Sequence, residues 1–376
     1  MRHLMAKIAD YFREADKILL ILSIFTSLYG TVAVFSATYY KETYRPAITQ
    51  FGAMLLGLMA AVIISAYDYE KIAKRWYIVA AIGLIPVILT FFIGFAPEGT
   101  DDKAWLDLGV TTFQPSELLK VCFTVTFAVH LKRIKPNINK LKYLIPLCIH
   151  GAFPVLLIHF QGDDGTALVF AVMVLFMMWT AGVSWKYFLL AFSAAAVASP
   201  FIYFFVMNDQ HRERIKSLFN PVKDIQGIDY QQWRGSVALA NGGWTGQGFL
   251  KGDLTQAGAV PESHNDFIFV SIGEEFGFLG CLVVMLLLAA ICLRCIRIAR
   301  ICSNDMGKYI CVGIFAMIFA QSVINIGMCT SVLPVIGVTL PFFSAGGTSL
   351  LCLFLGVGLV LNVYMHRNSR TIYLRD

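Results

Sequence analysis

Charged residues are scarce in this chain. Only 14% of its 376 residues are Asp, Glu, Lys or Arg, whereas typical soluble domains contain about 25%. Hydrophobic residues make up 57% of the chain, and the mean hydropathy is +0.68. This composition excludes an ordinary water-soluble domain and is typical of a membrane protein that crosses the bilayer many times.

Further absences exclude other classes of function. The basic residues form no patch of the kind that binds nucleic acid. Cys292 and Cys295 have C-x-x-C spacing, but no histidine lies near them and nearly all nine cysteines fall inside apolar runs, so no metal or redox site is expected there. No clear internal repeat suggests an inverted-repeat transporter. The first apolar run lacks a clean cleavage site, which indicates an uncleaved helix.

Apolar runs of roughly 20 residues, the length that crosses a bilayer, are abundant. We therefore expect an all-α polytopic membrane protein with about ten transmembrane helices, forming a single domain over residues 1–376. The expected helices cover residues 17–39, 46–66, 76–96, 114–131, 143–160, 165–182, 186–207, 266–293, 309–330 and 346–366.

The distribution of lysine and arginine predicts the orientation of these helices. Six segments on one side of the expected bundle carry 20 of the 30 basic residues. These segments are 1–17, 67–75, 132–142, the region around Lys186, 294–308 and the tail after His366. The positive-inside rule places this side, and with it both termini, in the cytoplasm. The net charge of +6 is then a consequence of topology.

One connection is much longer than the others. Residues 208–265 separate the seventh and eighth helices, and loops of such length are usually functional or disordered. Aromatic residues and the glycine cluster 241–248 favour an ordered extracytoplasmic cap with short helices. The polar loops 97–113, 161–166 and 331–347 are expected on the same outer face.

The strongest candidate for chemistry is Asp266, where polar sequence runs directly into an apolar helix. A carboxylate at the border of the hydrocarbon is costly without a partner and so marks a functional site. Asp266 could cap the helix, or it could act as a general base whose pKa is raised by its apolar surroundings. Together with Glu262 and His264 it could also hold a divalent cation such as Mg or Mn, so the metal content stays open.

Other polar residues in the outer half are further candidates. Glu117 and Lys120 are spaced i, i+3 and can neutralise each other, or Lys120 can meet an anionic ligand. Arg45 lies on the outer side and suits a phosphate or a lipid headgroup. Trp105 is either an interfacial aromatic or a stacking wall for a sugar.

Glu274 and Glu275 follow Asp266 two turns into the same expected helix. A structural hydrogen-bonding role is favoured for both residues, because an acid inside a helix bundle needs a partner.

Several motifs occur in a characteristic order. They are W-L-D-L-G at 105–109, Q-P-S-E at 114–117, P-E-S-H-N-D-F-I-F at 261–269, G-E-E-F-G at 273–277, N-I-G-M at 325–328 and G-G-T-S-L at 346–350. Together they resemble the SEDS family of shape, elongation, division and sporulation proteins, which includes RodA and FtsW. The resemblance spans residues 17–366, essentially the whole chain.

The resemblance implies a peptidoglycan glycosyltransferase in the bacterial cytoplasmic membrane. Such an enzyme polymerises lipid II on the outer face, releases undecaprenyl pyrophosphate and works with a class B penicillin-binding protein. The resemblance makes Asp266 the catalytic aspartate. The expected substrate-binding residues are Arg45, Trp105, Glu117, Lys120, Asp163, Glu262 and His264.

The chain also departs from the family pattern. Residues 162–166 read G-D-D-G-T, which keeps Asp163, adds Asp164 and lacks the usual proline, and Arg234-Gly235 replaces a Q-S pair. The segment G-Q-G-F-L-K-G at 246–252 is closer to RodA than to FtsW, which favours elongation over division. Two alternatives from other classes stay open: a lipid II flippase, and a non-catalytic scaffold for the penicillin-binding protein.

Overall fold

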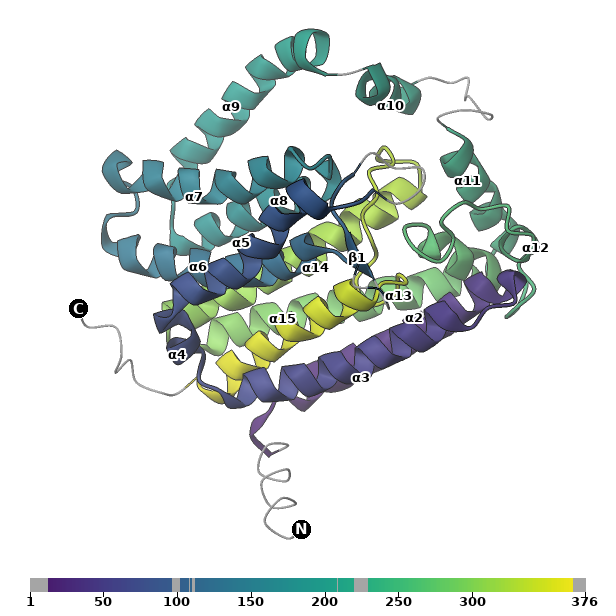
Figure 1. Cartoon of the computed structure of the whole chain (residues 1–376), viewed down its shortest axis with the longest axis horizontal. Coiled ribbons are helices and arrows are strands. Elements are labelled where there is room, and N and C mark those ends of the chain that lie inside the picture. The colour runs from purple at the N-terminus through teal and green to yellow at the C-terminus, as the bar shows by residue number, and fades with distance from the viewer. Residues whose placement is uncertain are drawn as a thin grey trace.

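The computed structural model describes residues 13–96, 102–107, 109, 112–207, 209–219 and 229–367. The chain forms one helical bundle (Figure 1). The long helices are α2 (Lys17–Thr38), α3 (Arg45–Ala66), α5 (Trp76–Ile93), α6 (Pro115–Ile134), α7 (Leu141–His159), α8 (Asp164–Ala181), α9 (Trp185–Phe201), α13 (Ile268–Ile301), α14 (Asp305–Cys329) and α15 (Gly347–Met365). Shorter elements are η1 (Tyr39–Lys41), α4 (Tyr69–Lys74), η2 (Lys135–Asn137), η3 (Ile202–Val206), α10 (Asp209–Phe219), α11 (Tyr230–Gly242) and α12 (Asp253–Gln256).

The all-α polytopic membrane fold is confirmed. In the part of the chain that the structure describes, nine helices are long and apolar enough to cross a membrane. The one expected helix that is missing from these nine is 114–131, observed as α6, which has the length but carries charged residues at both ends. It packs against α5, α8 and α14, and most of its side chains are buried. Its polar groups are thus covered by neighbouring helices rather than by lipid.

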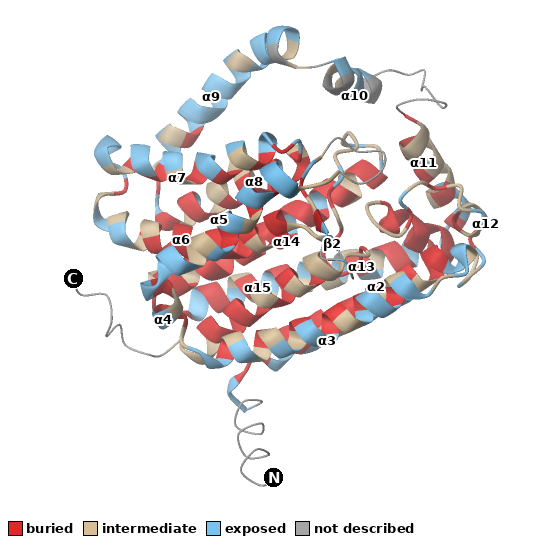
Figure 2. Cartoon of the chain, viewed as in Figure 1, coloured by how far each residue is buried: buried red, intermediate tan, exposed pale blue. Residues whose placement is uncertain are grey.

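The core lies where α13, α14 and α15 meet the other helices (Figure 2). Close approach of α3 and α15 depends on small residues, since a Cβ on Gly57 would lie 2.8 Å from Phe354 and one on Gly358 would lie 2.7 Å from Ala61. By contrast, α9 has only Phe188 buried and leans away from the bundle toward α10 (Figures 1 and 2).

Two predicted helix boundaries are wrong at the basic end of the bundle, the end that holds the basic segments 67–75, 132–142 and 294–308. The eighth expected helix, 266–293, continues as α13 to Ile301, and α14 already begins at Asp305. The predicted loop 294–308 therefore shrinks to a short turn. Helix-forming Leu, Ile and Arg residues continue the helix, and Arg294 is anchored by Asp16 of the segment before α2.

Short helices lie in the described part of the long connection, while its extracytoplasmic side stays a prediction. Within loop 208–265, α10, α11 and α12 are helical, whereas residues 208 and 220–228 lie outside the described residues. In loop 97–113 two short strands, β1 (Leu106–Asp107) and β2 (Thr112–Phe113), pair antiparallel with Leu106 opposite Phe113. Strands of two residues carry no readable sequence pattern, and the prediction missed them.

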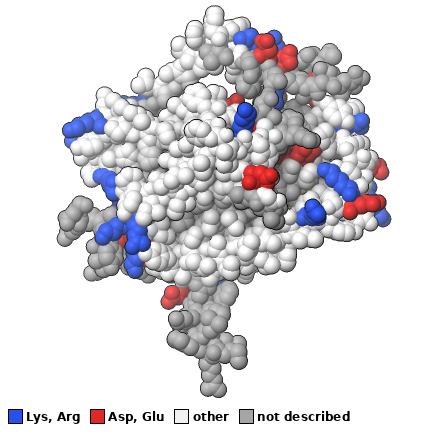
Figure 3. Space-filling view, in the orientation of Figure 1, with Lys and Arg blue, Asp and Glu red and all other residues white. Residues whose placement is uncertain are grey.

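Charged side chains gather at the two ends of the bundle (Figure 3). On this face a group of blue Lys and Arg side chains lies near α4, a broad uncharged surface follows, and acidic side chains lie together with some Lys and Arg toward α10 and α12. The uncharged band matches a hydrocarbon layer. The termini expected in the cytoplasm, residues 1–12 and 368–376, lie outside the described residues.

Candidate functional site

The helix that carries the candidate site is broken at Gly277. This residue has φ 66° and ψ −164° inside α13, so the first turns of α13 form a separate piece. The backbone groups released by the break pair with the loop after α11: Phe278 N donates to Gly243 O at 2.9 Å, and Gly248 N donates to Glu275 O at 2.9 Å. A Cβ on Gly277 would lie 2.4 Å from Gly246 N, so the close approach requires glycine.

Glu274 and Glu275 fasten this loop to the broken helix. Glu274 is fully buried and accepts hydrogen bonds from Leu254 N at 2.9 Å and from Thr255 N and Oγ1 at 2.8 and 2.6 Å. Glu275 accepts from Ser36 Oγ at 2.5 Å and from Gln256 Nε2 at 2.9 Å. The prediction of structural hydrogen bonding for both glutamates is confirmed.

Asp266 lies directly before α13 but does not cap it. The N-cap residue is Phe267, and no side chain bonds to the free amides of the first turn, so the capping interpretation is wrong. The carboxylate instead faces loop 331–347, because Asp266 Oδ2 would lie 3.5 Å from a Cβ placed on Gly337. The side chain is partly exposed, which leaves it within reach of a ligand.

The surroundings of Asp266 favour its neutral form. Burial, and after it the neighbouring carboxylates of Glu262, Asp163 and Asp102, together raise the pKa of its carboxyl from 3.8 to about 7. No hydrogen bond from the described residues offsets these effects. A carboxylate with a pKa near 7 can accept a proton at neutral pH and release it again, as a general base requires.

Asp163 lies at the start of α8, which touches loop 331–347 through Gly165. It caps α8, because Thr166 N donates to its Oδ1 at 2.8 Å, and Gln114 Nε2 donates to Oδ2 at 3.2 Å. Burial raises the pKa of Asp163, although the hydrogen bonds from Thr166 and the charge of Lys120 act in the opposite direction. The two aspartates are close enough for the charge of Asp163 to act on Asp266, so the fold joins motifs that are about 100 residues apart in sequence.

Glu117 and Lys120 form the pair that their spacing predicts. Lys120 Nζ lies 2.6 Å from Glu117 Oε1, and both side chains are buried. Ser349 Oγ at the start of α15 donates to Glu117 Oε2 at 3.3 Å. The pair therefore links α6 to α15 beside Asp163, and its predicted role in substrate binding stays a prediction.

Glu262 and His264 lie in the turn before Asp266. Glu262 is exposed, has φ 51° and accepts from Asn265 Nδ2 at 2.6 Å. Burial first, and then the charge of Lys41, lower the pKa of His264, while Glu262 raises it. His264 Nδ1 is buried without a hydrogen-bond partner among the described residues.

The described residues do not fit the suggested metal site. Over the ranges given above, no three or more His, Cys, Asp and Glu side chains are arranged so that they could hold a metal ion. Glu262, His264 and Asp266 are close in sequence, but Glu262 is turned toward Asn265.

Arg45 and Trp105 lie at the same end of the bundle as Asp266. Arg45 is exposed at the first position of α3. Trp105 is partly exposed, and its carbonyl accepts a hydrogen bond from Phe95 N at 2.9 Å. Their outer location and their contact with a substrate stay predictions.

The sequence analysis missed the amide and hydroxyl groups that hold loop 331–347. Gln50 Nε2 donates to Ser344 O at 3.0 Å, and Gly346 N donates to Gln50 Oε1 at 3.1 Å. Ser344 Oγ donates to Asn265 O at 2.8 Å. The available signal was Gln50 near the start of an apolar run, where an uncharged amide needs a buried partner.

The chain is similar to known proteins over nearly its whole length. Residues 16–369 match the model of the FtsW, RodA and SpoVE family, described as cell cycle protein. The chain is 30% identical over 357 residues to the peptidoglycan glycosyltransferase MrdB of Escherichia coli K12, which covers 94% of each chain. It is also 30% identical to the probable peptidoglycan glycosyltransferase FtsW of Trichlorobacter lovleyi, which covers 93% of each chain.

Solved structures show the same fold. A chain of a peptidoglycan synthase complex that coordinates polymerization and crosslinking superposes with a TM-score of 0.82 at 27% identity, covering 95% of this chain and 99% of that chain. The rod shape determining protein RodA of Thermus thermophilus superposes with a TM-score of 0.68 at 24% identity, covering 95% and 98%. At that identity the likeness to RodA concerns the fold alone.

Proposed function

The chain belongs to the FtsW, RodA and SpoVE family, and from this premise we propose that it is a peptidoglycan glycosyltransferase that polymerises lipid II with Asp266 as general base. The relatives named as peptidoglycan glycosyltransferases match this chain over nearly their whole length. The proposal therefore concerns the activity of the whole chain.

The proposed reaction joins two lipid-linked saccharides. The GlcNAc 4-hydroxyl of the acceptor attacks the anomeric carbon of the donor MurNAc, and the bond from that carbon to undecaprenyl pyrophosphate breaks. The hydroxyl proton passes to the Asp266 carboxylate, and the leaving pyrophosphate takes the bonding electrons. A base with a pKa near 7 matches this task, because it is ionised often enough to accept the proton and basic enough to hold it.

The single observation that carries the proposal is the position of Asp266. It is a partly exposed carboxylate at the acidic end of a membrane-spanning bundle, with a pKa raised to about 7 by burial and by other acids. An acid that lacks a structural partner and lies next to a hydrocarbon layer is costly to fold, which favours a chemical role.

The location and the partners follow from the same premise. The chain is a multi-pass membrane protein, and we infer that it lies in the bacterial cytoplasmic membrane with both termini in the cytoplasm and Asp266 on the outer face. The basic residues near α4 support this orientation. We also infer a class B penicillin-binding protein as its partner, since the similar synthase complex couples polymerization with crosslinking. The segment G-Q-G-F-L-K-G at 246–252, which is closer to RodA than to FtsW, supports a role in cell elongation.

The test is polymerisation of lipid II by the purified protein with its penicillin-binding partner. Asp266→Asn keeps the size of the side chain but removes the base, so we expect the rate of glycan formation to fall by about 1000-fold, within the range for loss of general-base catalysis. Asp305→Asn is the matched control, because Asp305 lies at the opposite end of the bundle beside Lys135.

Three results would contradict the proposal. Full glycan synthesis by Asp266→Asn would show that Asp266 is not the general base. Movement of lipid II across vesicles without polymerisation, unaffected by Asp266→Asn, would support a flippase. Growth of a depleted strain restored by Asp266→Asn would support a non-catalytic scaffold.

A further inference from the structure

Asn325 joins the backbone of the proposed base to the wall of the site. This residue lies one turn before the end of α14 and is fully buried. Its Nδ2 donates to Asp266 O at 2.8 Å and to Val338 O at 2.7 Å. One amide group thereby holds two chain segments that come from different parts of the sequence.

Both bonds lie directly beside the carboxylate of Asp266. Val338 follows Gly337, the residue whose Cβ position lies 3.5 Å from Asp266 Oδ2. The two donors of Asn325 therefore fix the spacing between the proposed base and loop 331–347. Gly337 has φ 68°, so the chain turns sharply at this wall.

The carbonyl of Asp266 depends on this amide. The turn before α13 leaves it outside the helical hydrogen-bond ladder: Ile268 N bonds to Asn265 O, and Val270 N bonds to Phe267 O. Besides Asn325, the only other described donor to the Asp266 carbonyl is Cys329 Sγ at 3.4 Å. A thiol is a weak donor, so the amide of Asn325 is the main hydrogen-bond restraint on the Asp266 carbonyl among the described residues.

We propose that Asn325 is a positioning residue that sets the distance between Asp266 and the Gly337–Val338 wall. A primary amide supplies two hydrogens from one uncharged nitrogen, whereas aspartate would supply none. The inference rests on the proposed function, because it assigns to Asn325 the alignment of the same base. A displacement of about 1 Å in such a site lowers the rate by about 100-fold.

The chain contains a matched control for the purely structural effect of this amide. Asn362 on α15 is also fully buried, and its Nδ2 donates to Ile64 O at 2.6 Å and to Tyr67 O. Its Oδ1 accepts from Tyr69 N at 3.0 Å. Asn362 thus ties a loop in the same manner, but at the end of the bundle opposite to Asp266.

The experiment compares Asn325→Ala, Asn325→Ser and Asn362→Ala in the full chain with its partner. Lipid II polymerisation is measured between pH 5 and 9, per amount of folded protein determined by size exclusion and thermal unfolding. We expect Asn325→Ala to lower kcat by about 100-fold with little change in KM. Asn325→Ser, which keeps one donor, should fall between Asn325→Ala and the wild type.

The pH profile gives a readout that a structural role would not move. Release of Asp266 from its fixed place among Glu262, Asp163 and Asp102 should shift the acidic limb of kcat to lower pH in Asn325→Ala. Asn362→Ala should unfold at a lower temperature but keep the wild-type kcat and the wild-type position of the acidic limb of kcat against pH.

The outcomes separate this inference from the proposed function. If Asp266→Asn is inactive and Asn325→Ala keeps kcat within threefold of wild type with an unmoved pH limb, Asn325 does not position the base. If Asn325→Ala does not fold, Asn325→Ser decides the matter by the same criteria. Activity of Asp266→Asn would instead overturn the proposed function itself.

Discussion

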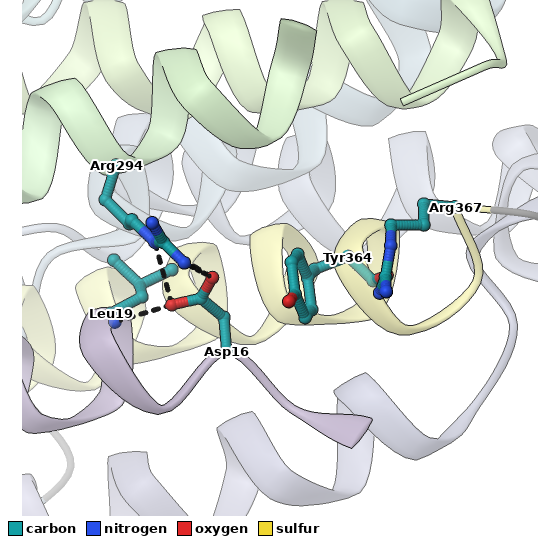
Figure 4. Close-up of polar contacts among 5 residues, drawn as sticks. All are labelled: Asp16, Leu19, Arg294, Tyr364 and Arg367. Carbon is teal, nitrogen blue, oxygen red and sulfur yellow. Dashed lines mark hydrogen bonds and ion pairs between the residues drawn. The ribbon is translucent and has the colours of Figure 1, made fainter. Parts of the chain in front are cut away.

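Two aspartates, each just before a long helix, have opposite surroundings at opposite ends of the bundle. Asp16 caps α2 through a bond from Leu19 N at 2.9 Å, and Arg294 of α13 grips both of its oxygens, with Nε at 3.0 Å from Oδ1 and 2.9 Å from Oδ2 (Figure 4). Asp266 caps nothing, and the charges that act on it are other carboxylates.

This comparison distinguishes Asp16, an acid with a structural role, from Asp266, the acid proposed to take part in the chemistry. At the basic end, the bonds from Arg294 hold both oxygens of Asp16 and join the start of α2 to α13. Arg367 stacks on the ring of Tyr364 at 4.2 Å nearby (Figure 4). At the acidic end, the fold leaves one carboxylate without such support, which costs stability and leaves a group able to react.

The largest effect on stability is expected from Asp16→Ala. This change removes the cap of α2 and leaves the guanidinium of Arg294 partly buried without its partner. Breaking a buried ion pair in this way costs about 3–5 kcal/mol. We expect a lower unfolding temperature in detergent and an unchanged kcat per folded molecule. A loss of polymerisation at unchanged stability would break the distinction between the two ends.

Asp266→Asn, in contrast, should increase the free energy of unfolding at neutral pH. The folded pKa of Asp266, about 7, lies above its ordinary value of 3.8, so ionisation of this group opposes folding. The roughly 3-unit shift corresponds to at most ~4 kcal/mol, and solvent at the partly exposed carboxylate reduces this to about 1–2 kcal/mol.

The pH dependence of this stabilisation follows from linkage. Below the ordinary pKa both states bind the proton, and Asn and protonated Asp are equivalent. As the pH rises toward 7 the wild type loses stability relative to Asp266→Asn, and the difference is complete above pH 7. Unfolding temperatures of both proteins at pH 4 and pH 8 measure it. A variant less stable than wild type at pH 8 would show that the charge of Asp266 is structurally useful.

The smallest effect is expected from Asp163→Asn. Asparagine keeps the cap of α8 but removes a negative charge that raises the pKa of Asp266. The base is active when ionised, so the polymerisation rate of the wild type should rise with pH through about 7. In Asp163→Asn this limb should move to lower pH, by about half a unit. The measurement is the polymerisation rate as a function of pH, with Asp164→Asn as control. If the acidic limb of Asp163→Asn stays at its wild-type pH, the charge of Asp163 does not act on Asp266.

Local properties of the sequence predicted much of the fold. Long apolar runs gave the membrane helices, and the spacing of Glu117 and Lys120 gave their ion pair, because both depend only on neighbouring residues. The motif around Asp266 indicated the site. The end of α13 was predicted too early, since Arg294 is held inside by an acid far away in sequence.

The sequence by itself determined that this chain spans a membrane and which acid borders the hydrocarbon, because hydrophobicity and charge are properties of short segments. Only the tertiary structure decided which polar groups meet. Asn325 bonds to Asp266, 59 residues away, and Gln50 bonds to Ser344, 294 residues away. Such partners are chosen by helix packing, because a buried amide or carbonyl must bond to whatever group the fold brings within reach.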